Sequence, residues 1–442
     1  MSRDILNKAR EVVQKAEKYG AQGVRATIDR QRDSEVEWLD QGLERVREST
    51  TMGLGLTLYA DGCYSSHNTS DLRSEALDTF IEDAVDLTRL LAKDEHRKLP
   101  DAKYFENQFK GDLKQYDPKG SEMVTGADRR RIAKDLVDAT YSAPGGDIIV
   151  SSKSSCSDSL YETAKVTSNG MEGHAIGTFF SFWVQTTVQD EGDRRPRSFW
   201  FDGSLLRNQL GSVEETGRMA VKRVLEEVGQ KPIETGKYNC IIENRQVRRV
   251  LGGLLGPLNG GSIQQQRSFL AEKMGQQIAS PLFSMTDDPH IPSAFGSSTF
   301  DNEGMSTRRR PIIEDGVLRN FYLNTYYASK LGLEPTTGDS TNLVFKTGEH
   351  DLEGLIRKMG DGLLLTGFSG GNSNGATGDF SIGVKGHLIR GGKRVQPIAE
   401  MNLGGNHGEI WKQITAVGND EYLKSSVRVP SILFEGLQFS GV

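Results

Sequence analysis

The sequence predicts an α+β protein, with an N-terminal α/β layered domain followed by a β-rich C-terminal domain of antiparallel sheets. Helical and strand-like patterns are mixed over about the first 230 residues, whereas strand and turn signals dominate after Tyr238. The chain has 442 residues, too many for one ordinary core, so two or three domains are expected. We place an N-terminal α+β domain at 1–100, a middle α+β segment at 101–230 and the β-rich domain at 231–442.

The first segment reads as a helix, then antiparallel strands, then a second helix. Residues 5–18 place their apolar side chains on one helical stripe, which consists of Ile5, Ala9, Val12, Val13 and Ala16. Strand-like runs follow at 24–29, 35–39 and 53–59, and Asp61-Gly62 then signals a hairpin. Residues 74–91 predict the second amphipathic helix.

The middle segment begins with a polar, irregular stretch at 98–125, which we interpret as a linker. Helical patterns cover 127–139 and 212–228, and residues 147–188 between them are rich in strand signals.

In the C-terminal segment, helices are predicted at 245–258 and 268–278. Hairpins are predicted at Asp315-Gly316, inside the run 311–323, and at Gly391-Gly392.

Composition excludes several function classes. The formal net charge of −6 argues against a nucleic-acid binder, since no broad basic face would neutralise phosphates. The charged first helix does not resemble a signal peptide, and no apolar run reaches a membrane span of about 18 residues. Cys63, Cys156 and Cys240 are scattered and odd in number, which suits reduced thiols. We therefore expect a cytoplasmic protein without membrane partners.

The stretch 363–386, LLLTGFSGGNSNGATGDFSIGVKG, is the most informative part of the chain. An apolar strand enters a loop of Gly, Ser and Asn, and a second strand leaves it. Because Gly370 and Gly371 have no side chains, another backbone can approach this loop closely.

Together with FDNEGMSTRRRPIIEDGVLRNFYLNTYYASKLG at 300–332 and SIQQQRSFLAEKMGQQIASP at 262–281, this stretch resembles the TldD/PmbA family, the modulators of DNA gyrase. The family-motif residues of the first run are Asp301, Glu303, Gly304 and Thr307. The family contains zinc peptidases of the TldD type and metal-free subunits of the PmbA (TldE) type. The resemblance implies a cytoplasmic protein that forms a homodimer or pairs with the other type.

The TldD type carries His-Glu-x-x-x-His and a later Cys, and this chain lacks both features. Alignment of the pattern places Leu251 and Gly256 at the histidines, Gly252 at the base and Phe368 at the Cys. None of these side chains can bind zinc or move a proton. Moreover, no two of the seven histidines lie within five residues of each other.

The resemblance therefore implies a non-catalytic PmbA/TldE-type subunit, with no cofactor and no metal of its own. Its partner would be a TldD-type zinc peptidase subunit, or a second copy of this chain, and peptides would be the substrates of the complex. The loop predicted to contact peptide or partner contains Ser369, Gly370, Gly371, Asn372, Thr377 and Gly378. It would offer free main-chain groups for strand addition.

Two other classes of function stay open. One is a peptidase or other hydrolase that acts alone, with chemistry at Asp287, His290, His387 or His407. The other is a module that binds extended peptides without cleaving them.

Several local patterns favour structural interpretations over chemical ones. Asp287, Asp288 and His290, or His407 and Glu409, could hold a metal, but turns and solvated loops are commoner sources of such groups. Gly367-Phe-Ser369-Gly-Gly371 matches a nucleophile elbow but lacks the helix that must follow. Residues 370–377 resemble a phosphate loop with Ala376 in place of Lys.

Two basic runs, 129–131 and 308–310, are interpreted as solvated faces rather than anion sites, because three adjacent residues cannot face one way. Six aromatic residues in the C-terminal half, some of them beyond the needs of one β core, predict a large apolar dimer surface. They are Phe283, Phe295, Phe321, Tyr322, Tyr326 and Tyr327.

Overall fold

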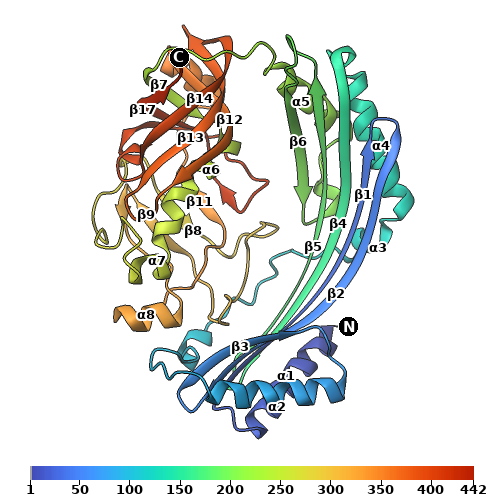
Figure 1. Ribbon diagram of the computed structural model, residues 1–442, viewed down its shortest axis with the longest axis vertical. Coiled ribbons are helices and arrows are strands. Elements are labelled where there is room, and N and C mark those ends of the chain that lie inside the picture. The colour runs from blue at the N-terminus through green and yellow to red at the C-terminus, as the bar shows by residue number, and fades with distance from the viewer. Residues whose placement is uncertain (1) are drawn as a thin grey trace.

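The computed structural model describes residues 2–442 and shows two lobes (Figure 1). The N-terminal lobe is built on one six-stranded antiparallel sheet in the order β3-β2-β1-β4-β5-β6. Its strands are β1 (Gly23–Leu39), β2 (Gly42–Ala60), β3 (Cys63–Thr69), β4 (Ile149–Thr167), β5 (Glu172–Val188) and β6 (Arg197–Ser204). Because β1 pairs with both β2 and β4, the segments 1–100 and 101–230 share this sheet.

Helices cover the convex face of the long sheet, and the C-terminal lobe lies on its concave side (Figure 1). The helices are α1 (Ser2–Lys18), α2 (Ser74–Arg89), α3 (Pro118–Met123), α4 (Gly126–Ser142) and α5 (Val213–Leu225). Alternate residues of β1, such as Ala26 and Ile28, pack under the helices. The residues between them, such as Arg25 and Thr27, therefore face the other lobe.

The predicted helical stripe of α1 is confirmed, since all five of its side chains are buried in the N-terminal core. The predicted strand runs 24–29 and 35–39 form one continuous strand, β1. The polar stretch between them is extended because β2 and β4 supply hydrogen-bonding partners on both sides.

The C-terminal lobe contains two sheets, which confirms the predicted β-rich character. One has five strands: β10 (Val317–Leu318), β9 (Arg310–Glu314), β8 (Met285–Asp287), β11 (Leu343–Phe345) and β16 (Val427–Arg428). The other contains β14 (Lys393–Asn406), β13 (Asp379–Arg390), β12 (Gly362–Ser373), β7 (Gly236–Ile242), β17 (Ile432–Ser440) and β15 (Ile414–Val417). Most pairs are antiparallel as expected, but β12–β7 and β11–β16 are parallel.

An additional pairing between β14 and β17 closes the second sheet on itself. The enclosed core contains the large side chains Trp411, Phe434 and Phe439. Phe283, Phe321 and Tyr322 also lie in this core, with at most 4% of their surface exposed. These three of the six aromatic residues therefore belong to the core and are not available as a partner surface.

The helices of this lobe are α6 (Asn244–Leu255), α7 (Gly260–Gln264), α8 (Thr325–Leu331) and α9 (Leu352–Met359). Short 3₁₀ turns occur at Ala102–Phe105, Gly146–Ile148, Arg207–Gln209, Gly256–Leu258 and Ile410–Gln413. The predicted helix at 245–258 is confirmed by α6 and the turn that continues it. No helix of the described chain crosses a membrane, because none is both long and apolar enough.

The predicted helix at 268–278 is wrong. Within this segment only isolated i to i−3 turns form, at Ala271, Lys273 and Gln276, and other N–H groups bond to distant parts of the chain. Phe269 donates to Gly375 O at 3.1 Å, and Gly275 donates to Leu318 O at 2.8 Å. Tertiary partners for the main chain have overridden the helical pattern.

The hairpin at Asp315-Gly316 is confirmed between β9 and β10. Both turn residues have positive φ, 46° and 79°, as a tight two-residue turn requires. The three cysteines are buried and free.

Candidate functional site

The first candidate site is a pocket of about 420 Å³ between helix α6 and the β12–β13 hairpin. Arg249, Gly252, Gly253 and Gly256 line it from the helix side, at the i, i+3, i+4, i+7 spacing of one helical face. Gly371, Asn372, Ser373 and Gly375 line it from the hairpin, and Phe380, Ile382 and His407 form much of its apolar wall.

The glycines of α6 shape this pocket in two different ways. A Cβ atom added at Gly252 or Gly256 would meet nothing within 4 Å, so both positions open into free space. A Cβ atom at Gly253 would lie 1.9 Å from His407 Nε2. Gly253 is therefore required for the imidazole to pack against the helix.

His407 is the buried side chain of the pocket wall, with 3% of its surface exposed. Its ring stacks on Phe380 with the centroids 4.4 Å apart, and its Nδ1 has no hydrogen-bond partner among the described residues. Burial lowers the pKa of His407 to about 4, because charge would be poorly solvated here. The imidazole is neutral at pH 7.

The hairpin bends into the pocket through a β-bulge. The register shifts between Ser369 and Asn372, so Gly370 and Gly371 together face Ile382. Both glycines have positive φ, 54° and 100°, a conformation that other residues rarely adopt. Arg249 reaches across from α6 and donates from Nη2 to Gly370 O at 2.9 Å.

The four residues that the alignment places at the metal site do not all lie at the same place in the structure. Gly252 and Gly256 line the pocket, whereas Leu251 is fully buried in the core and Phe368 packs against that core. Neighbouring positions on a helix point about 100° apart, so Leu251 and Gly252 face different surroundings.

The pocket lining does not fit a zinc ion. A zinc peptidase site needs three protein ligands and a base, and the pocket lining offers one imidazole with no carboxylate or thiol. Within residues 2–442, no group of three or more His, Cys, Asp and Glu side chains could hold a metal ion. Of His290, His387 and His407, only the last lines this pocket.

The remaining loop residues have structural contacts. Ser369 is exposed on β12, and the chain after it continues as a strand, so the helix of a nucleophile elbow is absent at this point. Thr377 Oγ1 donates to Asp379 at 2.7 Å, and His407 N donates to Gly378 O at 2.7 Å. Asn406 Nδ2 donates to Thr377 O at 2.8 Å, so Thr377 and Gly378 both tie the hairpin tip to the segment that carries His407.

The family-motif run lies between the lobes rather than at this pocket. Glu303 accepts a hydrogen bond from Thr325 N, 2.7 Å away, at the start of α8. Gly304 has φ of 91° and Thr307 is buried. Asp301 Oδ1 accepts from the backbone N–H groups of Glu303 and Met305.

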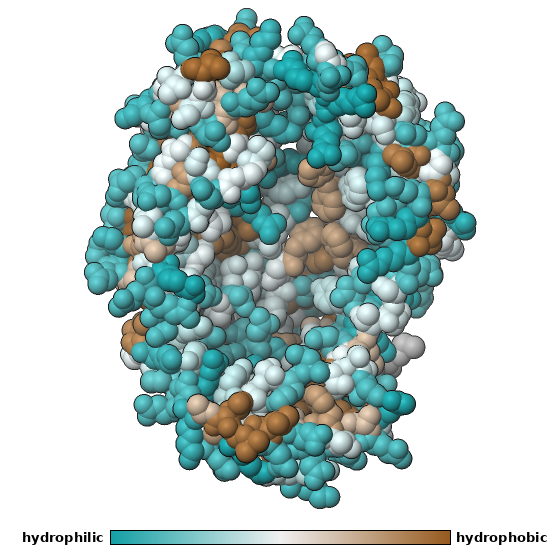
Figure 2. All heavy atoms as spheres, viewed as in Figure 1, coloured by the Kyte–Doolittle hydropathy of each residue, from teal (hydrophilic) through white to brown (hydrophobic). Residues whose placement is uncertain are grey.

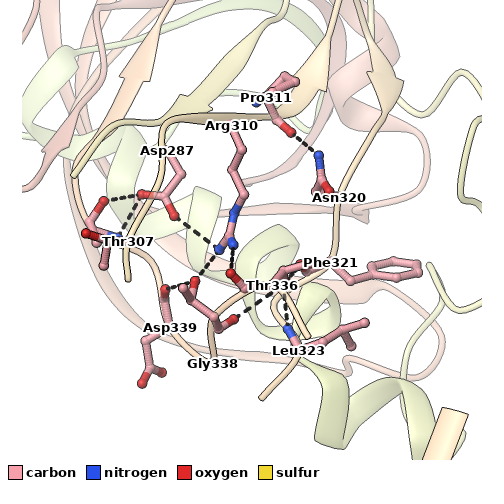
Figure 3. Close-up of polar contacts among 12 residues, drawn as sticks. Asp287, Thr307, Arg310, Pro311, Asn320, Phe321, Leu323, Thr336, Gly338 and Asp339 are labelled. Atoms are coloured by element: carbon pink, nitrogen blue, oxygen red, sulfur yellow. Dashed lines mark hydrogen bonds and ion pairs between the residues drawn. The ribbon is translucent and has the colours of Figure 1, made fainter. Parts of the chain in front are cut away.

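The run 308–310 is not a wholly solvated face. Arg310 is largely buried and pairs with the buried Asp287 at 3.4 Å, and it also donates to Thr336 O (Figure 3). Asp287 accepts in addition from Thr341 N at 2.9 Å. Both oxygens of the Asp287 carboxylate are therefore used in contacts that join β8 and β9 to the loop at 336–341.

The run 129–131 departs from a solvated face in the same way. Arg129 is buried and pairs with Asp158, which is 6% exposed at its side chain.

The carboxylates of the candidate metal groups also form ion pairs. Asp288 pairs with Arg309 at 3.2 Å, and Glu409 pairs with Lys412 at 3.0 Å. Asp287, Asp288 and Glu409, the carboxylates of the two candidate metal groups, are thus all in ion pairs.

A larger cavity of about 940 Å³ lies between the lobes, where Figure 2 shows the molecule hollowed. Tyr161, Thr163 and Lys165 of β4 line it from the sheet, and residues 296–302 line it from the other lobe. Lys165 Nζ donates to Asp301 O and Asn302 O, both at 2.9 Å. The sequence does not predict this cavity, because no local pattern shows that β4 and residues 296–302 meet.

The fold and the first pocket define a class of two-lobed α+β proteins in which a helix and a glycine-rich hairpin enclose a pocket. The chain belongs to the PmbA/TldD family, which confirms the resemblance. The models of PmbA/TldA metallopeptidase domain 1, central domain and C-terminal domain match residues 27–88, 120–227 and 235–441.

Individual relatives resemble nearly the whole chain. Metalloprotease PmbA of Escherichia coli O157:H7 is 27% identical over 406 residues, covering 90% of this chain and 88% of its own. A protein of Bacteroides thetaiotaomicron VPI-5482, described as a modulator of DNA gyrase, is 39% identical with a TM-score of 0.94, covering 99% and 98%. TldE from Thermococcus kodakarensis shares the fold, with 20% identity, a TM-score of 0.86 and coverage of 98% and 100%.

Proposed function

We propose that this chain is a non-catalytic subunit of a TldD/TldE-type cytoplasmic metallopeptidase complex that degrades or trims unfolded or modified peptides. Its partner is a TldD-type zinc peptidase subunit. The observation that carries the proposal is the α6 pocket, which has room for catalytic side chains but has glycines in their place.

The open space at Gly252 and Gly256 supports this interpretation. Side chains at these two positions would project into the pocket, as ligands and a base must. The pocket therefore has room for side chains that would supply such chemistry, and glycine supplies none. Such a chain contributes binding surface and leaves bond cleavage to another subunit.

The free edge of β12 supports a role in holding peptide. Strand β7 pairs with β12 only at Leu363–Leu365, whereas β13 pairs with β12 as far as Ser373. The β12 edge at residues 366–373 therefore has no second strand among the described residues. An extended peptide can add to such an edge by main-chain hydrogen bonds, which tolerate varied sequences.

The same free edge favours a second candidate function, a module that binds peptides without any peptidase partner. The two functions differ in whether a TldD-type subunit gains activity from this chain.

The test is metal analysis and a peptidase assay on this chain, on its TldD-type partner and on the mixture. We expect this chain to purify without stoichiometric zinc and without activity, and the mixture to cleave peptides faster than the partner alone. One equivalent of zinc that is lost in a His407→Ala variant would contradict the proposal. An unchanged partner rate would favour the binding module.

A Ser369→Ala variant is the matched control for hydrolysis by this chain. Removing a nucleophile costs several orders of magnitude in turnover, whereas an exposed strand serine contributes little. We expect the activity of the mixture to change less than about twofold.

A further inference from the structure

A second, smaller cavity of about 250 Å³ lies where the two lobes meet. Arg25, Tyr59, Tyr64, Arg97 and Lys98 line it from the N-terminal lobe. Asp301, Glu303, Asn324, Tyr326 and Asp339 line it from the C-terminal lobe. Asp301, Asn302 and Asp339 also line the 940 Å³ cavity, so the two cavities are neighbours.

The cationic side of this cavity has no anionic partners. Arg25, Arg97 and Lys98 form no ion pair with any carboxylate of residues 2–442, whereas the buried Arg129 and Arg310 are paired. Arg25 Nη1 is buried without a hydrogen-bond partner, and its Nη2 has only a 3.3 Å contact with Thr57 Oγ1. A buried guanidinium nitrogen without an acceptor is costly, so the cavity favours an anionic ligand group beside Arg25.

Aromatic rings fix the second guanidinium. Arg97 lies 3.4 Å from the ring centroid of Tyr326 and 4.3 Å from that of Tyr64. These rings come from different lobes. Arg97 is thus held in place by stacking, which leaves its N–H groups free of carboxylates.

The acidic side of the cavity contains a buried carboxylate oxygen, Asp301 Oδ2, without a hydrogen-bond partner in residues 2–442. Asp301 Oδ1 accepts two backbone N–H groups, at 2.8 and 2.9 Å, but the buried Oδ2 has no partner among the described residues. Lys165 holds the same turn through the carbonyl oxygens of Asp301 and Asn302 and does not bond to the carboxylate. An ammonium group would satisfy Oδ2.

We propose that this cavity binds a small peptide zwitterion, a free dipeptide, with its carboxylate at Arg25 and its ammonium group at Asp301. An anion alone would face Asp301, Glu303 and Asp339, and a cation alone would face Arg25, Arg97 and Lys98. Only a ligand with both charges satisfies both sides. The volume of 250 Å³ lies below the range of about 300–1,000 Å³ for drug-sized ligands, which suits a dipeptide.

The choice of a dipeptide rests on the proposed function, because short peptides are the products of a peptidase complex. Since both lobes line the cavity, a bound dipeptide also joins them. Ligand binding to the folded state should raise the melting temperature as its concentration rises above Kd.

The experiment is titration calorimetry on the purified full chain at pH 7.5 with Ala-Ala, N-acetyl-Ala-Ala and Ala-Ala-amide. We expect Ala-Ala to bind, and each blocked peptide to bind roughly tenfold more weakly, since each loses a charge-assisted hydrogen bond. Arg25→Gln should abolish the preference for Ala-Ala over its amide. Asp301→Asn should abolish the preference over the acetyl peptide.

Arg47→Gln is the matched control, because Arg47 is exposed on β2 and lies outside the cavity. It should leave all three affinities unchanged. If Arg25→Gln does not fold, Lys98→Gln replaces it, since Lys98 is exposed and lines the same side. The Lys98→Gln variant should reduce the ratio of the affinity for Ala-Ala to the affinity for Ala-Ala-amide.

Any of these results would overturn the proposal: no binding of Ala-Ala at a 100-fold molar excess over the protein, equal binding of all three peptides, or unchanged preferences in the variants. Inorganic phosphate that binds as tightly as Ala-Ala would mean an anion site instead. These measurements need neither zinc nor a partner subunit, so their failure is distinct from failure of the peptidase proposal.

Discussion

At the scale of single residues, His407 couples the α6 pocket to the stability of the lobe. Its ring is buried on Phe380 and Gly253, and its pKa in the folded chain is about 4, below the ordinary value of 6.5. Above pH 6.5 the imidazole is neutral in both the folded and the unfolded chain. Between pH 6.5 and 4, only the unfolded chain binds the proton, so folding stability falls as the pH falls.

The free energy of unfolding should therefore drop on acidification through His407. We expect a loss on the order of 2 kcal/mol between pH 7.5 and 4.5 from this residue, from the pKa difference. In urea titrations at the two pH values, His407→Gln should lose less stability than the parent. His350→Gln, at an exposed histidine, is the control and should follow the parent curve.

Two adjacent glycines of α6 give a sharper test of the pocket geometry. Gly252→Ala should raise the free energy of unfolding by about 0.5–1 kcal/mol, because alanine favours the helix and its Cβ meets open space. Gly253→Ala should lower it by about 1–3 kcal/mol, because its Cβ would clash with His407. Equal effects in denaturant titrations would show that His407 does not pack on the helix.

At the scale of elements, the sequence predicted those structures whose bonding is local. The α1 stripe, α6 and the Asp315-Gly316 hairpin follow from spacing and turn chemistry within a few residues. The helix predicted at 268–278 is wrong because the N–H groups of Phe269, Gly275 and Ile278 bond to the distant carbonyls of Gly375, Leu318 and Gly316, and only single turns form between them. No periodicity carries information about such partners.

The β12 bulge allows a matched pair of variants in the glycine loop. A Cβ atom at Gly371 would lie 2.8 Å from Ser381 O, and φ there is 100°, so Gly371→Ala must distort the bulge. Gly370 has φ of 54° and open space, which asparagine tolerates.

We expect Gly371→Ala to reduce peptide turnover of the complex severalfold while assembly, measured by gel filtration, persists. Gly370→Asn should behave like the parent in both assays. Parent-like turnover for Gly371→Ala would mean that the hairpin is only a connector.

At the scale of the whole molecule, the sequence predicted the class of fold but not the sites formed between its parts. The motif alignment named Gly252 and Gly256, which line the α6 pocket, together with Leu251, which faces the core. The cavity that contains Arg25 and Asp301 could not be predicted at all. Its residues come from distant parts of the chain and meet only because the second lobe packs against the concave sheet.

Assembly is the prediction that belongs to this scale. We expect this chain to form a dimer, with a TldD-type subunit or with itself, that buries more than roughly 2,000 Å². Sedimentation at micromolar concentration, alone and in the mixture, measures the mass directly. A monomer in both samples would refute the pairing.

The pairing of β17 with β7, β14 and β15 has a consequence for biosynthesis. The closed sheet depends on residues 432–440, yet their partner β7 is made about two hundred residues earlier. The C-terminal lobe therefore cannot complete its core while the ribosome is still adding the last strand, and pairing over such long separations is slow. Until then the unpaired strand edges of the C-terminal lobe can pair with other chains and aggregate. We therefore expect the nascent full chain to depend on chaperones more than the N-terminal lobe alone does.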